Sequence, residues 1–391
     1  MNHALVSAEI QDFIRQNTKA DVPKLALQKN PFAPVEWHAI LEQISAKQKA
    51  ETKLPTWFQT KNIIYPSKIS VEQTSSEKTA AYKATLISGN RLIDMSGGFG
   101  IDDYYFAKKM SEVIHCEINS ELSEIVAHNC KALNVTNIRC IAGDSTEILK
   151  RQKVSFDWMY IDPSRRNDTK GKVFMLRDCL PNVPENLDLY FDYTRSVLIK
   201  TAPLLDITAG LAELKYVKAI HVVALDNDVK ELLWILEKNY HGSVKIIAVN
   251  ITKEATDSFS FDNSTTASAT FDLPKQYLYE PNAAIMKSGG FDEVSTQFNI
   301  AKLHPHSHLY TSNTLLKFPG RCFVIEKCVD YTKNEMKHLL TQTKANVTVR
   351  NFPETVDTIR KKWKIKEGGD RYCFFTTDKN NRKIVLLCTK L

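Results

Sequence analysis

The chain has 391 residues, 43% hydrophobic and 25% charged, which suits two to four globular domains. Its formal charge of +7 reflects 52 Lys and Arg against 45 Asp and Glu. No uncharged apolar run reaches the roughly eighteen residues that a membrane span needs. No signal-peptide pattern follows Met1, and the eight cysteines form no C-x-x-C pair. We therefore expect a cytoplasmic protein with free thiols, outside the membrane.

The first segment, residues 1–66, shows helical spacing of its apolar residues. The sequence predicts helices here but does not indicate their role. Residues 69–86 predict one further helix, entered through Thr74, Ser75 and Ser76, with Glu77 placed for a capping box from Thr74.

An acid and three glycines follow the apolar pair at residues 92–93. Residues 94–100 read DMSGGFG, and a helical pattern follows at 101–110. Glycine allows dihedrals that a Cβ forbids and lets the backbone approach a ligand. The helix that follows directs its free N–H groups to the same point. This order predicts a site for a nucleotide-like ligand.

Three more acids end short apolar runs further along the chain. They are Glu117, Asp144 and Asp162, at successive intervals of 23, 27 and 18 residues from Asp94 onward. In a doubly wound parallel sheet the carboxyl ends of such strands face one crevice. The sequence therefore predicts an α/β, Rossmann-like sheet. Later elements are expected as strands at 197–199, 219–224 and 244–249, a helix at 228–237, and a polar loop or linker at 253–272.

These motifs resemble those of class I methyltransferases that use S-adenosylmethionine. The strand-1 motif of that family, Asp-x-x-x-Gly-x-Gly, is matched by Asp94, Gly98 and Gly100. The resemblance implies that Glu117 accepts hydrogen bonds from both ribose hydroxyls and that Asp144 receives the adenine amino group. A dinucleotide site would need a third glycine, which residues 98–103 lack. The cofactor contacts expected in full are Gln73, Thr74, Asp94, Ser96, Gly98, Gly100, Glu117, Ile118, Asp144, Ser145 and Asp162.

Two interpretations apply to the polar residues of the helix before strand 1. In methyltransferases this helix often borders the methionine end of the cofactor, which implies contacts from Gln73, Thr74 and Ser75. A helix cap alone also explains Thr74 and Ser75. Both interpretations stay open on the sequence.

Residues 162–166 read DPSRR, at the expected end of strand 4. Enzymes that methylate exocyclic amines carry an acid or amide, two prolines and an aromatic ring here. This chain has Ser164 and Arg165 where the second proline and the ring would be. Arginine stacks on bases and binds phosphate, so a nucleic-acid substrate is compatible, although amine specificity does not follow. The alternative is a solvated basic loop. The expected catalytic residues are Asp162, Pro163, Arg165 and Lys200, with Arg165 and Arg166 holding the nucleotide.

Three histidines, His304, His306 and His308, alternate in the segment before the last 74 residues. On a strand they would share one face and could bind zinc. No nearby Cys or acid completes a ligand set, so a polar strand or loop is favoured. We expect no metal.

The last segment, residues 318–391, reads as a β-α-β-α-β-β module and carries the basic excess. It has 16 Lys and Arg against 8 Asp and Glu, a net of +8, so the rest of the chain has 7 minus 8, or −1. A basic module joined to a balanced core suggests a polyanionic partner. A solvated helix face is the alternative. The residues expected to contact an RNA backbone are Arg360, Lys361, Lys364 and Arg371.

Five stretches, DMSGGFG, DPSRR, LIKTAPLLDI, YLYEPNAAIMKSGGF and VRNFPETVDTIRKKWKIKEGGDRY, together resemble a bacterial family of class I methyltransferases that end in a THUMP-like domain. The resemblance implies a ferredoxin-like, RNA-binding module at the end of the chain. It implies methylation of a base in structured RNA, rRNA or tRNA, by direct transfer. The alternatives are an RNA-binding or ribosome-assembly factor with a vestigial cofactor site, and a methyltransferase for a protein or small molecule. The expected division is a helical segment at 1–66, a methyltransferase domain at 67–252, a linker with a small α/β segment at 253–317, and a THUMP-like domain at 318–391.

Overall fold

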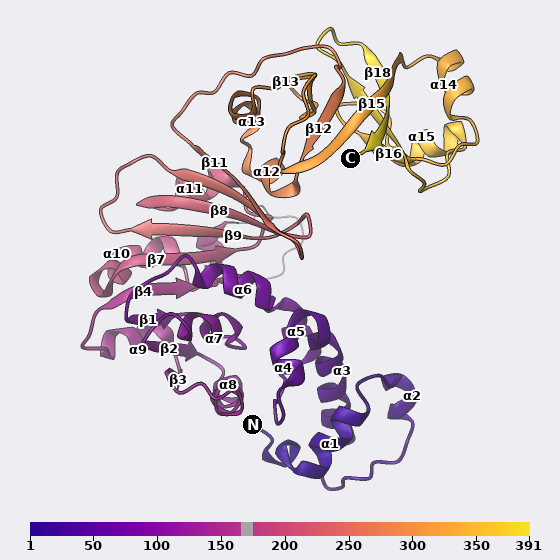
Figure 1. Ribbon diagram of the computed structural model, residues 1–391. Coiled ribbons are helices and arrows are strands. Elements are labelled where there is room, and N and C mark those ends of the chain that lie inside the picture. The colour runs from indigo at the N-terminus through magenta and orange to yellow at the C-terminus, as the bar shows by residue number, and fades with distance from the viewer. Residues whose placement is uncertain (166–174) are drawn as a thin grey trace. The chain divides into compact units, whose positions relative to one another are not determined.

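The computed structural model of the chain describes residues 1–165 and 175–391 (Figure 1). The chain divides into two compact units. The first comprises Met1–Lys218 with Leu232–Gly242, and the second comprises Ala219–Glu231 with Ser243–Leu391. Among the described residues, no helix is long and apolar enough to cross a membrane.

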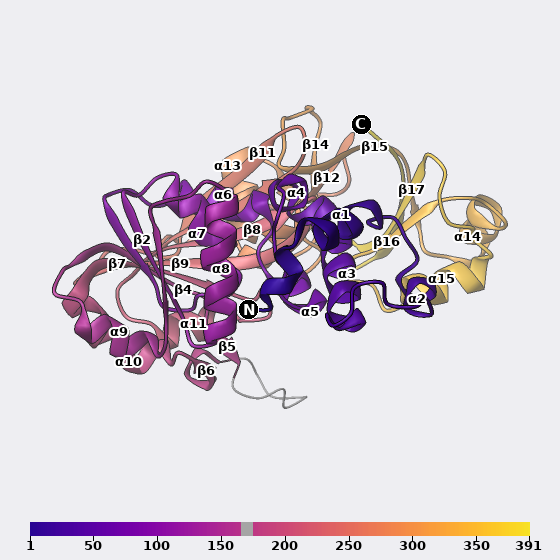
Figure 2. The ribbon, with the colours of Figure 1, turned by 90° about the horizontal axis from the view of Figure 1, so that it is seen from below.

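The N-terminal segment is helical, as predicted. The long helix α3 packs against α1, α2, α4 and α5, and Figure 2 shows these helices gathered beside it. The elements are η1 (His3–Val6), α1 (Ala8–Gln16), α2 (Val22–Ala26), α3 (Trp37–Lys53), α4 (Pro55–Gln59), α5 (Lys68–Gln73) and α6 (Glu77–Ala84).

The helix expected at 69–86 is correct in its entry through residues 74–76, where Ser76 caps α6, but residues 68–73 form the separate helix α5. Thr74 ends α5, and the Ser76 hydroxyl caps α6 by accepting the Thr79 N–H at 3.2 Å. Serine side chains compete with the helix for backbone groups, which favours a break at consecutive serines. The expected capping box is wrong. The Glu77 carboxylate instead accepts the Thr56 N–H at 2.6 Å and the Thr56 hydroxyl at 2.7 Å.

A nine-stranded sheet follows, with the order β11-β10-β8-β9-β7-β4-β1-β2-β3. β1, β2, β3, β4 and β7 are parallel, so their carboxyl ends meet at one edge, as predicted. The strands are β1 (Arg91–Asp94), β2 (Glu112–Glu117), β3 (Ile138–Ala142), β4 (Phe156–Ile161), β7 (Thr194–Thr201), β8 (Val217–Leu225), β9 (Asp228–Glu237), β10 (Lys245–Ile251) and β11 (Thr256–Asp262). The helices between them are α7 (Ile101–Ala107), α8 (Ser120–Ala132), α9 (Ser145–Arg151), α10 (Val183–Tyr193) and α11 (Ile207–Glu213), with η2 at Leu176–Asp178 and a two-stranded ribbon of β5 (Ser164–Arg165) and β6 (Cys179–Leu180).

Two expectations at the far edge of this sheet are wrong. Residues 228–237 form β9, antiparallel to β7, rather than a helix. Asp226 and Asn227 take φ angles of 50° and 65°, the left-handed pair that closes a tight hairpin. The expected polar linker at 253–272 contains β11, which pairs antiparallel with β10.

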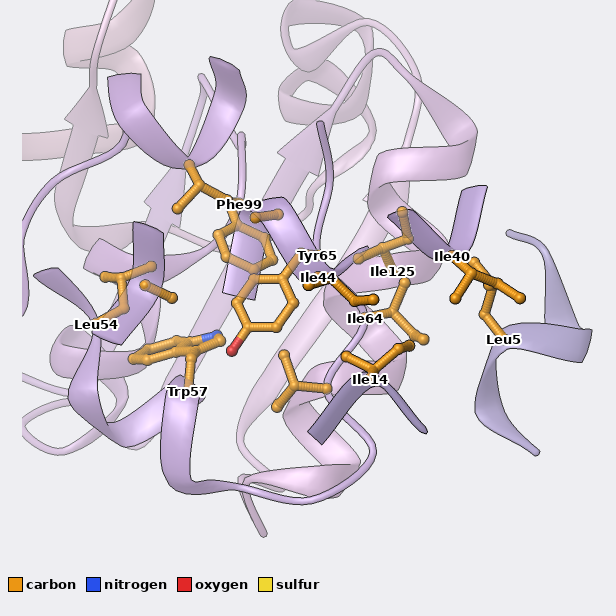
Figure 3. Packing of buried hydrophobic residues seen from close by; sticks show 14 of the residues in the cluster. Leu5, Ile14, Ile40, Ile44, Leu54, Trp57, Ile64, Tyr65, Phe99 and Ile125 are labelled. Atoms are coloured by element: carbon orange, nitrogen blue, oxygen red, sulfur yellow. The ribbon is translucent and has the colours of Figure 1, made fainter. Parts of the chain in front are cut away.

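The N-terminal helices share a hydrophobic core with the glycine turn that follows β1. Phe99 of that turn lies with Trp57 of α4 and Tyr65 (Figure 3), at ring-centroid distances of 6.4 and 6.1 Å. Ile101 of α7 and Ile125 of α8 belong to the same buried cluster. Burial of these apolar side chains stabilises the turn in one position.

The second unit contains a seven-stranded sheet of order β13-β14-β12-β15-β18-β17-β16. The β-α-β-α-β-β order expected for the last segment is confirmed. Alternate residues of β17 face two clusters: Cys373 and Phe375 pack with α14 and α15, and Phe374 packs with β12 and β15. The elements are β12 (Tyr277–Pro281), α12 (Ala283–Ser288), α13 (Phe291–Phe298), β13 (Ala301–Lys302), β14 (Tyr310–Ser312), β15 (Gly320–Asp330), α14 (Lys333–Leu340), β16 (Asn346–Val349), α15 (Val356–Trp363), β17 (Arg371–Thr377) and β18 (Lys383–Lys390).

Candidate active site

The turn after β1 is organised by Asp94. One oxygen of its carboxylate accepts the Ser96 N–H at 2.8 Å, the Ser96 hydroxyl at 2.6 Å and the Gly97 N–H at 3.2 Å. Asp94 is only 1% exposed. Asp94 therefore stabilises the conformation of the turn through these hydrogen bonds.

The three glycines of the turn have different surroundings. Their φ angles are 57° at Gly97, 72° at Gly98 and 71° at Gly100, in the left-handed region that favours glycine. A Cβ at Gly97 would lie 2.5 Å from the Cys116 carbonyl oxygen, whereas a Cβ at Gly98 would meet no described atom within 4 Å. Gly98 thus leaves open space, as a backbone that a ligand approaches must.

Glu117, at the end of β2, is bonded to this turn. Its carboxylate accepts the Gly98 N–H and the Asn119 N–H, each at 2.7 Å. A carboxylate has about four acceptor sites, so two remain for the hydroxyls of a ribose. Ile118 beside it is 78% exposed, an apolar surface next to the polar turn.

Asp144, after β3, serves as the N-cap of α9. It accepts the Glu147 N–H at 2.9 Å through one oxygen, and Ser145 is the first residue of that helix. Its carboxylate is exposed at the strand edge where the prediction places it. Gln73 is exposed and Thr74 half-buried at the end of α5.

The end of β4 is tied to the same turn through Ser96. The Ser96 hydroxyl accepts the N–H of Asp162 at 2.8 Å while it donates to Asp94. The Asp162 carboxylate forms an ion pair with Lys200 of β7. Asp162 is 38% exposed at its side chain, and Pro163 is buried. The structure therefore brings Asp162 and Lys200 together, as sequence spacing could not.

The arginines of the DPSRR motif are only partly described. The backbone of Arg165 pairs with Cys179 in the small β5–β6 ribbon. Arg166 lies outside the described residues.

A buried charged network, missed by the sequence analysis, lies next to this site. The Lys83 ammonium is fully buried, 3.2 Å from Asp102. Asp102 also accepts hydrogen bonds from Ser75 at 2.9 Å and Tyr160 at 2.7 Å. Burial alone raises the pKa of Asp102, but the charges of Lys83 and Lys200 and the two hydrogen bonds hold it below its usual range. A lysine within a short helix reads as solvated, so no local signal predicts this network.

A second buried cluster, of Asp94, Asp103 and His115, lies under the turn. The His115 Nδ1 and an Asp103 oxygen are 2.6 Å apart. Burial, with the charge of Asp103, raises the pKa of Asp94 well above its usual range. Burial, with the charge of Asp102, does the same to the pKa of Asp103. Within the described ranges, these three form the one group with metal-ligand composition, one atom from each lying within 4.8 Å of the others. The expected absence of a metal stays a prediction.

The three alternating histidines lie in a turn rather than on one strand face. His304 is bonded to Asn381 at 3.0 Å and to Asn351 at 2.9 Å through its two ring nitrogens. His308 is stacked on Phe291, with ring centroids 3.6 Å apart. The interpretation as a polar loop is confirmed.

The basic residues of α15 and its following loop are not equivalent. Lys361, Lys364 and Arg371 are exposed. Arg360 is half-buried and forms an ion pair with Glu367 at 3.2 Å. The structure therefore leaves the first three as the accessible cations of the predicted set.

The chain is similar to a solved methyltransferase and to three family models. The crystal structure of a candidate methyltransferase from Porphyromonas gingivalis W83 is 31% identical and matches with a TM-score of 0.87, over 98% of this chain and 97% of that chain. The chain belongs to the same methyltransferase family. Three segments of this methyltransferase match family models: residues 89–163 an RNA cap guanine-N2 methyltransferase, 277–319 a ferredoxin-like domain and 320–390 a THUMP domain-like module. The class I methyltransferase with a THUMP-like end, implied by the resemblance, is confirmed.

More distant solved structures match parts of the methyltransferase. TrmK of M. capricolum, solved with S-adenosyl-homocysteine, is 17% identical over 41% of this chain and 68% of that chain, with a TM-score of 0.32. An O-methyltransferase from Bacillus cereus, also solved with S-adenosyl-homocysteine, is 12% identical over 57% of this chain and 100% of that chain, with a TM-score of 0.35. No curated protein matches the chain.

Proposed function

We propose that this methyltransferase transfers the methyl group of S-adenosylmethionine to a base of structured RNA, either rRNA or tRNA. The observation that carries the proposal is the Ser96 hydroxyl, which joins the glycine turn to the N–H of Asp162. A cofactor turn and an acceptor-side carboxylate are thereby held as one hydrogen-bonded unit. The THUMP domain-like match at residues 320–390 and the exposed cations there support RNA as the substrate.

The roles proposed for the site follow the strand ends. Glu117 binds the ribose and Asp144 the adenine, and the open space at Gly98 suits close approach of the cofactor. The remaining proposed cofactor contacts are Gln73, Thr74, Asp94, Ser96, Gly100, Ile118, Ser145 and Asp162. The proposed substrate contacts are Arg165, Arg166, Arg360, Lys361, Lys364 and Arg371. The proposed domain boundaries follow residues 66, 252 and 317.

The chemistry asked of the chain is positioning. S-adenosylmethionine supplies an electrophilic methyl group, and the protein must hold the acceptor in line with it. Lys200 orients the Asp162 carboxylate through their ion pair. Asp162 accepts a hydrogen bond from the acceptor and takes its proton where one must leave. Pro163 restricts the backbone directly after this carboxylate.

Single-turnover transfer of labelled methyl to bulk RNA from cells lacking the protein tests the proposal. Asp162→Ala is expected to slow transfer by about a hundredfold to ten-thousandfold while cofactor and RNA binding persist. Asp228→Ala is the matched control, since it breaks an exposed ion pair with Lys230 in β9 and is expected to leave the rate unchanged. Equal labelling by wild type and Asp162→Ala would remove Asp162 from catalysis. If wild type binds the cofactor but labels no RNA, a vestigial site or a protein or small-molecule substrate replaces the proposal.

A further inference from the structure

Lys47 of α3 carries a buried ammonium group. The residue is 9% exposed, and its Nζ donates to the Phe58 carbonyl at 2.6 Å. The Phe58 ring centroid lies 4.9 Å from the same nitrogen. In the part of the chain that the structure describes, no carboxylate lies within 4.0 Å of it. A buried charge without an opposite charge lowers the stability of a fold.

Two further cationic side chains lie near Lys47. Lys47 lines a hollow of about 330 Å³ between α1, α3 and residues 58–62, and Arg15 and Lys61 line it too. Burial, with the charge of Arg15, lowers the pKa of Lys47 to about 8. Asp12 supplies one negative charge through its ion pair with Arg15 at 2.7 Å. Three cations thus face one anion.

The hollow also offers neutral hydrogen-bond donors. The side-chain amides that can donate are those of Gln11, Gln59 and Asn62. Lys and Arg together with amide donors match the oxygens of a phosphate group, which accepts several charge-assisted bonds at once. An anion in this hollow would offset the repulsion between Arg15 and Lys47.

We infer that this hollow binds a phosphate group, and that the phosphate belongs to the backbone of the RNA substrate. The assignment of the phosphate to RNA rests on the proposed function, whereas the binding of a phosphate group in the hollow does not. RNA is favoured because the helix that supplies Phe58 also supplies Trp57, which packs on Phe99 of the glycine turn. A strand of RNA bound at the hollow is therefore held by the same unit as the cofactor turn.

Thermal unfolding of the full chain with inorganic phosphate tests the chemistry. Potassium phosphate is expected to raise the Tm above the value in potassium chloride of equal ionic strength. Lys47→Met is expected to raise the Tm without phosphate, because it removes a buried charge, and to abolish the phosphate response. Arg15→Gln, at a side chain 54% exposed, is expected to weaken apparent phosphate affinity about tenfold. Lys24→Gln, at a side chain 84% exposed, is the control and is expected to respond like wild type.

Binding of bulk RNA from cells lacking the protein tests the source. Lys47→Met and Arg15→Gln are each expected to weaken RNA binding and to reduce its salt slope by about one unit. A phosphate response with unchanged RNA affinity in both variants overturns RNA as the source and assigns the hollow to free phosphate. A wild-type Tm that is equal in phosphate and chloride, together with unchanged RNA affinity, overturns the inference entirely. Methyl transfer to RNA, measured on the same wild-type preparation, separates these outcomes from failure of the proposed function.

Discussion

The ammonium of Lys83 lies 3.2 Å from the carboxylate of Asp102, and Lys83 is fully buried. The pair connects α6 to the first turn of α7, directly after the glycine turn. Tyr160, which donates to Asp102, extends the connection to β4 two residues before Asp162. The elements that frame the candidate active site are therefore joined by one buried charged network.

Removing the carboxylate of this pair is expected to destabilise the fold. Asp102→Ala takes away the anion facing a buried ammonium, a change that typically costs about 3–5 kcal/mol. Asp102→Asn keeps oxygen and nitrogen near Ser75 and Tyr160 and is expected to cost less. Urea unfolding at neutral pH gives both values. The difference in unfolding free energy between wild type and either variant should become smaller in acid. The pKa of Asp102 is lowered in the folded protein, so the stability it contributes is lost as the pH falls through that folded pKa. A difference that stays constant with pH contradicts this account.

Asp94→Asn is expected to change how stability depends on pH. The pKa of Asp94 is raised by burial and by Asp103, so its contribution is complete below the unfolded pKa of about 4 and is lost as pH rises through the folded value. Asparagine keeps the oxygen that accepts from Ser96 and Gly97 but cannot ionise. The Tm of the variant should therefore gain on wild type as pH rises. Parallel Tm curves between pH 5 and 9 would show that Asp94 does not titrate there.

Two neighbouring glycines are expected to respond differently to alanine. Gly97→Ala places a methyl group 2.5 Å from a backbone oxygen, so it should lose more stability than the roughly 1–2 kcal/mol of left-handed strain alone. Gly98→Ala carries only that strain, since its Cβ meets no described atom within 4 Å, but the methyl group enters the proposed cofactor space. Chemical denaturation and S-adenosyl-homocysteine binding, measured on both, should rank them in opposite orders. If both variants lose affinity only in proportion to their loss of stability, the cofactor does not bind next to Gly98.

Glu117→Ala is expected to weaken S-adenosyl-homocysteine binding by about 1.5–3 kcal/mol, because it removes a charged acceptor for the ribose. Calorimetry measures the change. Glu112→Ala is the matched control at the other end of β2, where Glu112 faces Arg91 at 3.3 Å. Its affinity should equal that of wild type. Similar losses in the two variants would indicate damage to the strand rather than to a ribose contact.

Lys361, Lys364 and Arg371 are expected to contact RNA phosphates. Replacing all three with glutamine should weaken binding to every RNA tested and reduce the salt slope by about one unit or slightly less per lost contact. Lys333 and Lys337 are exposed on α14 of the same module, and their double replacement serves as the control. Arg360, the fourth proposed contact in this module, is left out of the triple variant because its replacement would also remove the ion pair with Glu367. An unaltered salt slope in the triple variant would leave these residues as a solvated surface.

Features with a short-range signature could be predicted from the sequence. The glycine turn follows from an apolar run, an acid and glycines within seven residues, since glycine takes the left-handed dihedrals observed there without the steric cost of a Cβ. The acids at 117, 144 and 162 each end an apolar run, so parallel pairing alone places them at one edge. The order of the last segment could be predicted because turn residues separate its elements.

Only the tertiary structure decided the rest. The apolar run in residues 228–237 suits a helix or a buried strand, and its place between β7 and β8 selects the strand. Lys83 and Asp102 are nineteen positions apart by their numbering, and no local pattern distinguishes Lys83 or Lys47 from solvated lysines. Their burial is set by which helices pack together. Ionic contacts of this kind depend on distances between separate elements, and those distances exist only once the hydrophobic core has formed.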